Sequence, residues 1–206
     1  MRRLGFVLFA AILALPGCGL IGGSSVKPPT VSPSQAADKA IELCDKDANG
    51  LLNATELAAC PGLLAALAKY DTTGDKQLSR EEIVERLKSM YASGTGLSSL
   101  RCQVMLDNRP LRGGHVRFVP EPFLGGDVKS AEGDADGSGS ATIGIADAEL
   151  PENARGLKLI QLGVYRVEIT HPTAKIPARY NTQTTLGYEH HPTNPDEVVV
   201  FRLQSK

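Results

Sequence analysis

Apolar side chains recur at helical spacing in the first half of the chain and alternate along short segments in the second half. Between residues 34 and 91 they fall three or four positions apart around two polar runs, which predicts short helices. From residue 98 onward, turn residues separate alternating segments that predict strands over 100–106, 114–119, 141–145, 163–170 and 197–203, while 157–162 fits a strand or a helix. We therefore expect an α+β multidomain chain, with a small all-α unit followed by an all-β unit.

The N-terminal residues have a different pattern. Two arginines precede an apolar stretch of twelve residues, 4–15, which is typical of a secretion signal and too short for a spanning helix. The stretch ends in Leu15-Pro16-Gly17-Cys18, which resembles the bacterial lipobox. The resemblance implies removal of the signal peptide 1–17 and lipidation of Cys18, and hence a membrane-anchored lipoprotein outside the cytoplasm. An ordinary secretion signal with an incidental cysteine is the alternative interpretation.

Two further segments have neither helical nor strand periodicity. Residues 18–33 are rich in glycine, serine and proline and almost uncharged, which predicts a flexible tether. Residues 92–97 form a second, shorter linker of small polar residues. The expected folded units are therefore 34–91 and 98–206.

The most specific chemical pattern is a run of alternating oxygen-bearing residues over 45–56. It matches the twelve-residue EF-hand calcium loop, with Gly50 at the sharp turn and a final glutamate that can bind through both oxygens. An Asp/Asn-rich turn between two helices is the alternative. The expected calcium ligands are Asp45, Asp47, Asn49, the Leu51 carbonyl, Asn53 and Glu56.

A second copy of this pattern occupies residues 71–82. Its expected ligands are Asp71, Thr73, Asp75, the Gln77 carbonyl, Ser79 and Glu82. Thr73 replaces a carboxylate and Lys76 replaces the turn glycine, so Lys76 must adopt a strained backbone conformation or distort the loop. We expect weaker calcium binding here than in the first loop. A loop retained only to pair with the first one is the alternative.

The spacing of the two loops is compact. The second loop starts 26 residues after the first, and Pro61-Gly62 interrupts the fourteen residues between them. This predicts a brief exiting helix that ends near Cys60, with Pro61 opening the next helix. Leu52 and Leu78, at the eighth position of each loop, predict a short strand contact. The compactness resembles that of dockerin modules, although both loops here end in glutamate, and it leaves a calcium-dependent assembly module as an alternative function.

Three cysteines remain once Cys18 is assigned to lipid. Cys44 precedes the first loop and Cys60 follows it by four residues, so they are expected to face each other. We predict a disulfide between them, which would stabilise the fold by roughly 3 kcal/mol on the chain-entropy model. Two buried thiols in contact are the alternative. Cys102 lies in a predicted strand and has no obvious partner.

The second half also carries turn and core residues in a recognisable order. They are Pro110, Leu111 and Gly114, then Gly163, Tyr165, Val167 and Ile169, then Pro177, Tyr180, Thr184 and Thr185. This order is similar to that of the carboxypeptidase regulatory-like, or transthyretin-like, domain of bacterial surface proteins. The resemblance covers 98–206 and implies a prealbumin-like sandwich, usually without catalysis.

Composition and missing motifs narrow the function further. The formal net charge is −1 and no Lys/Arg-rich run occurs, which argues against nucleic-acid binding. The run 134–139 resembles the start of a third calcium loop, but its twelfth position is Ile145, so we expect a turn. Neither a Gly-x-Ser-x-Gly nor a His-Glu-x-x-His motif occurs, and an enzyme is not expected; a hydrolase on the sandwich is the less favoured alternative. The expected function is calcium binding with a structural or interaction role at the cell envelope, with the membrane and an envelope protein as partners.

Overall fold

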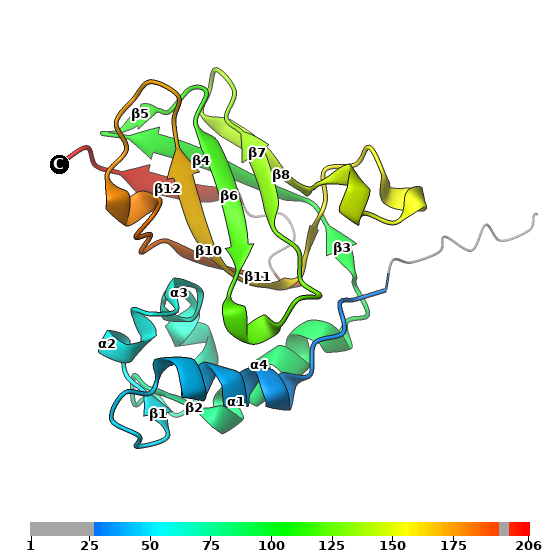
Figure 1. Ribbon diagram of the computed structural model, residues 1–206, viewed down its shortest axis with the longest axis vertical. Helices are drawn as coiled ribbons and strands as arrows, with labels where there is room; N and C mark the ends of the chain where they lie inside the picture. Colours follow the sequence, from blue (N-terminus) through cyan, green and yellow to red (C-terminus); the bar gives the residue numbers. More distant parts are fainter. Residues whose placement is uncertain (1–26, 194–197) are drawn as a thin grey trace, which may run out of the picture.

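The structure is a computed structural model that describes residues 27–193 and 198–206. The predicted signal peptide, Cys18 and part of the tether lie outside the described residues. Within these ranges the chain is a mixed helix and sheet protein, in which a group of helices lies against one side of a strongly curled, largely antiparallel sheet (Figure 1). None of the helices in these ranges has both the length and the apolar character needed to cross a bilayer.

Four α-helices form the helical layer, and local sequence explains where they begin. Asn53 and Ser79 each form a capping box with the glutamate three residues on, which starts α2 and α4. Pro61 opens α3 soon after α2 ends at Leu57, which confirms the predicted brief exiting helix. The helix bounds are Pro33–Cys44 for α1, Ala54–Leu57 for α2, Pro61–Tyr70 for α3 and Arg80–Ala92 for α4.

The predicted apolar faces of the helices are buried. Among the apolar residues at helical spacing in 34–91, Ile41 and Leu67 are partly buried, and those named at the end of this paragraph belong to the core. Burial of these side chains accounts for the stability of helices too short to persist alone. The fully or almost fully buried positions are Ala37, Ala40, Cys44, Leu57, Cys60, Leu63, Ala66, Tyr70, Ile83, Leu87 and Met90.

The main sheet runs in the order β11-β10-β6-β7-β8-β4-β12, with β5 beside β4. The β4–β12 pair is parallel and the other pairs are antiparallel. The strands of this sheet are β4 (Leu100–Leu106), β5 (Arg109–Pro110), β6 (His115–Pro120), β7 (Ala131–Asp134), β8 (Ser140–Ile145), β10 (Gly163–Thr170), β11 (Gly187–His190) and β12 (Val199–Leu203). A separate pair joins β3 (Leu97–Ser98) to β9 (Ile160–Gln161).

The five strands predicted from alternation are all present, and 157–162 contains the short strand β9 rather than a helix. Alternation did not predict β7 or β11. The expected turn at 134–139 is confirmed, because Asp136 accepts hydrogen bonds from the backbone of Ser138 and Ser140 between β7 and β8.

The curl of the sheet brings its distant strands together. Phe118 on β6 makes an edge contact with Phe201 on β12, with 6.0 Å between ring centroids, although three strands, β7, β8 and β4, lie between β6 and β12 in the sheet order. Tyr165 on β10 packs on the same Phe118 ring. These aromatic contacts fill the concave interior of the sheet.

The helices and the sheet share one set of buried apolar side chains. Helix α3 packs on β10 and β11, while α1 packs on α4 and on the 3₁₀ turn η1 (Pro122–Leu124). Helix α1 begins at Pro33 and β3 at Leu97, each one residue before the expected boundaries at 34 and 98. The division of the chain into separate domains remains a prediction.

Candidate metal centre

The first predicted loop folds around its own first and last acidic residues. Asp45 accepts hydrogen bonds from the backbone N–H groups three and five residues on, at 2.7 and 2.9 Å. Glu56 accepts from the N–H groups of Lys46 and Asn53, at 2.9 and 3.0 Å. Glu56 therefore bonds to both ends of the run and closes it into a loop.

Three carboxylates of the first loop converge. Asp45, Asp47 and Glu56 each offer an oxygen, and these oxygens lie within 4.8 Å of one another. No other three His, Cys, Asp or Glu side chains in residues 27–193 and 198–206 come this close together. Carboxylate oxygens are the hard donors that Ca²⁺ prefers, so the chemistry of this donor set fits that ion.

Of the remaining expected ligands of the first loop, Asn49 and Asn53 accept hydrogen bonds from nearby backbone N–H groups, and Leu51 lies in a short strand. The Asn49 side-chain oxygen accepts a hydrogen bond from Leu51 N–H at 2.7 Å. The Asn53 side chain caps α2 by accepting hydrogen bonds from the N–H groups of Thr55 and Glu56, at 2.9 and 3.2 Å. Leu51 belongs to the short strand β1 (Leu51–Leu52). These bonds preserve the local shape of the loop.

The second loop repeats this hydrogen-bond pattern. Asp71 accepts from Lys76 N–H at 2.8 Å, and Glu82 accepts from Thr72 and Ser79 N–H at 2.9 Å each. The Thr73 hydroxyl lies 3.3 Å from a carboxylate oxygen of both Asp71 and Glu82, so it points into the loop. Asp75 accepts from the N–H of the expected ligand Gln77 at 2.9 Å.

The backbone conformation at Lys76 follows the sequence prediction. Its φ is 64°, in the left-handed region, and Gly50 at the same position of the first loop has φ 81°. The fourth position is also left-handed in both loops, with φ 59° at Ala48 and 80° at Gly74. Each loop therefore has one glycine and one strained non-glycine residue at these two positions.

Hydrogen bonding keeps the closing glutamates ionised. Partial burial opposes ionisation of Glu82, but hydrogen bonds from Ser79, Thr72 and Thr73 outweigh this effect and lower its pKa to about 2. Hydrogen bonds from the backbone of Asn53 and Lys46 likewise lower the pKa of Glu56. Both side chains are thus anionic at neutral pH, the state that a cation requires.

A two-strand contact joins the loops. Strand β1 pairs antiparallel with β2 (Leu78–Ser79), and Leu52 lies opposite Leu78. Both leucines are fully buried. This confirms the predicted contact at the eighth loop position and fixes one loop against the other.

Cys44 and Cys60 lie beside the first loop as expected. They are free thiols in the structure, both buried, and a hydrogen bond joins them. This bond lowers the pKa of Cys44, while the same bond and burial raise the pKa of Cys60. Their contact brings the two sulfur atoms together, and the disulfide remains a prediction. Cys102 is buried in β4, where burial raises its pKa to about 12.

The structure also places buried polar residues that the sequence analysis did not identify. Glu189 on β11 is 2% exposed and forms ion pairs with Arg86 and Lys69 from two helices. Glu121 is completely buried; one of its oxygens accepts from Gly62 N–H at 2.8 Å, and the other has no partner among the described residues. No local pattern marks these residues, because their partners lie far away in sequence.

One serine–histidine contact bears on the hydrolase alternative. His190 Nε2 lies 2.7 Å from the Ser98 hydroxyl, but the buried Nδ1 atom has no hydrogen-bond partner among the described residues. Burial lowers the pKa of His190 to about 4. A catalytic histidine base is usually oriented through its second nitrogen and has a pKa nearer neutrality, so this pair does not favour a hydrolase.

Known proteins supply no assignment for this chain. Comparisons with protein-family models, with curated proteins and with solved structures found no match. Functional inference therefore depends on the residues and geometry of the loops.

Proposed function

We propose that the chain is a calcium-binding, lipid-anchored extracytoplasmic protein with a structural or interaction role at a bacterial cell envelope. In this proposal residues 34–91 form an EF-hand pair and residues 98–206 a prealbumin-like sandwich. The two loops bind Ca²⁺ through the ligands named above, and the first loop binds more tightly. Cys18 carries the lipid that attaches the chain to the membrane.

One observation carries the calcium assignment. The oxygens of Asp45, Asp47 and Glu56 lie within 4.8 Å of one another. Three like charges this close repel one another, so a bound divalent cation would stabilise the loop. Because β1 of the first loop pairs with β2 of the second, a cation bound in the first loop would also stabilise the second.

A structural role fits these loops better than rapid signalling. Extracellular modules of this kind bind calcium at about 10⁻⁴–10⁻³ M, a range that suits a constitutively bound ion. In addition, α3 already packs on β10 and β11, so this face of the helical unit is covered within the chain. Calcium would therefore stabilise the arrangement of helices on the sheet.

Calcium titration followed by calorimetry tests the proposal. The chain would start at Gly19, so that no membrane is needed. We expect saturable binding and a gain in helicity, both lost in the Glu56→Gln/Glu82→Gln variant. Asp134→Asn/Asp136→Asn is the matched control, because it removes two acids from the turn outside the loops. No heat and no change in helicity for the wild type would refute calcium binding.

The lipid anchor needs a separate test. Labelled palmitate should enter the wild-type chain in bacterial cells and fail to enter Cys18→Ala. Equal labelling of both chains would refute lipidation and leave the calcium assignment untouched.

A further inference from the structure

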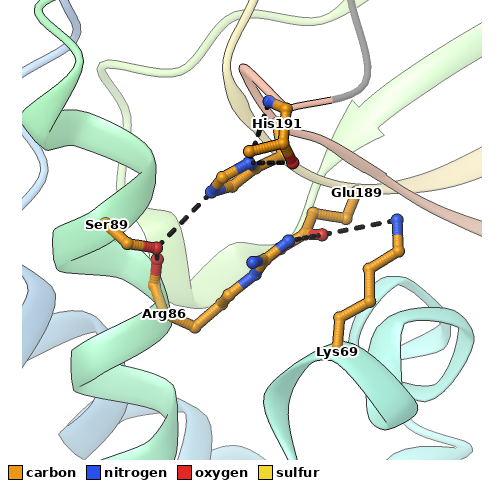
Figure 2. Close-up of polar contacts among 6 residues, drawn as sticks. Lys69, Arg86, Ser89, Glu189 and His191 are labelled. Carbon is orange, nitrogen blue, oxygen red and sulfur yellow. Dashed lines mark hydrogen bonds and ion pairs between the residues drawn. The ribbon is translucent and has the colours of Figure 1, made fainter.

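A buried carboxylate on the sheet connects the two helices that flank the second loop. Glu189 on β11 points between α3 and α4 (Figure 2). Arg86 of α4 donates to it through two nitrogens, at 2.8 and 2.7 Å, which is the two-pronged geometry typical of a strong arginine–carboxylate pair. Lys69 of α3 lies 3.6 Å from the same carboxylate.

Burial makes this contact important for the local structure. The Glu189 side chain has no exposed surface, and that of Arg86 is 20% exposed. Breaking a buried ion pair by removing one partner is costly, because the other charge stays buried without compensation. The positions of both helices relative to β11 therefore depend on Glu189 more strongly than they would on an exposed ion pair at the same place.

The two cations flank the second loop, one on each side. Lys69 precedes Asp71, the first expected ligand, by two residues, and Arg86 follows Glu82, the last one, by four. Each cation thus lies within about one helical turn of the loop. Because one carboxylate contacts both, it holds the entering and exiting helices at a fixed separation.

A second contact from the same strand supports this arrangement. His191 directly follows β11, and its Nε2 lies 3.5 Å from the Ser89 hydroxyl on α4 (Figure 2). Its Nδ1 contacts the Thr193 hydroxyl at 2.9 Å, which orients the ring. The end of β11 therefore meets α4 at two successive places along the helix.

We propose that Glu189 is a positioning residue for calcium binding by the second loop. The inference rests on the proposed function. In EF-hand proteins calcium affinity and the angle between flanking helices are coupled, and sensors open on binding. Glu189 fixes this angle from outside the loop, so that binding at the second loop and docking of the helices on the sheet favour each other reciprocally.

The experiment isolates each loop in the chain that starts at Gly19. Glu56→Gln leaves the second loop and Glu82→Gln leaves the first, and each is combined with Glu189→Gln. Calcium chloride titration by calorimetry should show at least roughly fivefold weaker binding by the second loop when Glu189 is replaced, the lower end of typical coupling. The first loop should change less than twofold.

Matched variants separate positioning from general destabilisation. Glu132→Gln on β7 removes a half-exposed carboxylate from the sheet and should leave both affinities unchanged. Arg86→Gln should reproduce the effect of Glu189→Gln, and the double variant should weaken the second loop no further. If Glu189→Gln fails to fold, Arg86→Lys keeps the charge but loses the two-pronged contact, and should weaken only the second loop. Amide hydrogen exchange should increase in α3 and α4 in the variants.

The possible results are distinct. Unchanged affinity of the second loop, or equal weakening of both loops, would overturn the positioning role. An inert second loop in Glu56→Gln, with normal binding in Glu82→Gln, would also overturn it and leave calcium binding by the first loop intact. Absence of calcium binding by the wild-type chain would refute the proposed function itself.

Discussion

Gly187 on β11 lies directly against Pro61 at the start of α3. A Cβ atom added to Gly187 would lie 1.9 Å from the Pro61 carbonyl oxygen, a distance that atoms cannot adopt. A second glycine, Gly62 in α3, is also tightly packed, because an added Cβ would lie 2.6 Å from the Val164 side chain on β10. Two glycines thus allow the backbone of α3 to touch the sheet.

Replacing this glycine should disrupt the packing of α3 on the sheet. The backbone of Pro61 cannot rotate away as a side chain could, so we expect Gly187→Ala to lower the free energy of unfolding by at least about 2 kcal/mol. Urea unfolding followed by circular dichroism would measure the loss. Gly137→Ala is the control, because its added methyl group meets nothing within 4 Å. Similar stability of the two variants would show that α3 does not pack as described.

The weaker affinity expected for the second loop can be reversed at one residue. Lys76 has a left-handed backbone conformation, with φ 64°, and its side chain adds a positive charge to the loop. Lys76→Gly should strengthen calcium binding by the second loop roughly threefold to tenfold, because a nearby charge no longer repels the cation. The measurement uses the Glu56→Gln chain, which isolates this loop. Ala48→Gly is the control in the first loop, since it replaces a left-handed residue without changing the charge. Weaker or unchanged calcium binding by Lys76→Gly would contradict the prediction.

Local patterns predicted the loops and most strands because the relevant residues are close in sequence. The twelve positions of each loop form their own hydrogen bonds, such as those of Asp45 and Glu56, and β10 alternates from Tyr165 to its end at Thr170. In β11 the buried positions include Glu189 and His190, so no apolar alternation marks this strand. Its burial depends on Arg86, 103 residues away, and a single sequence does not reveal such a contact.

The same limit applies to the association of helices and sheet. The sequence analysis treated residues 34–91 and 98–206 as units joined by a linker. The contacts between them involve a backbone N–H, the Glu121 carboxylate and the absence of a side chain at Gly187. Such contacts depend on how segments that are far apart in the sequence fit together, and hydrophobic periodicity does not predict them.

The stability of this contact region should depend on pH through Glu121. Burial raises the pKa of Glu121 to about 7, against the opposing effects of the Gly62 N–H and Arg166. The neutral acid is therefore favoured in the folded chain: its stabilising contribution is complete below the unfolded pKa of 4.5 and is lost as pH rises through about 7. Glu121→Gln should exceed the free energy of unfolding of the wild type by less than about 1 kcal/mol at pH 5 and by roughly 3 kcal/mol at pH 8.

His190 acts in the opposite direction over nearly the same range. Because burial lowers its pKa to about 4, its contribution is complete above the unfolded value of 6.5 and declines as pH falls toward 4. The two trends should offset each other in the wild type between pH 5 and 6.5, whereas Glu121→Gln should lose stability on acidification. Urea unfolding at pH 5, 6, 7 and 8 with a calcium chelator would measure both profiles, and parallel profiles would contradict the assignment.

The contact between Cys44 and Cys60 should become a disulfide under oxidising conditions. Oxidation would remove two hydrogens and link the end of α1 to the residue before α3, closing a segment of about 16 residues that contains the first loop. On the chain-entropy model the bond adds roughly 3 kcal/mol to the free energy of unfolding. Intact mass and peptide mapping would detect the bond, and unfolding with and without reductant would measure its effect. Cys102 serves as the internal control, because in the chain that starts at Gly19 it should be the one thiol that alkylates after denaturation; three alkylated cysteines in the oxidised protein would exclude the bond.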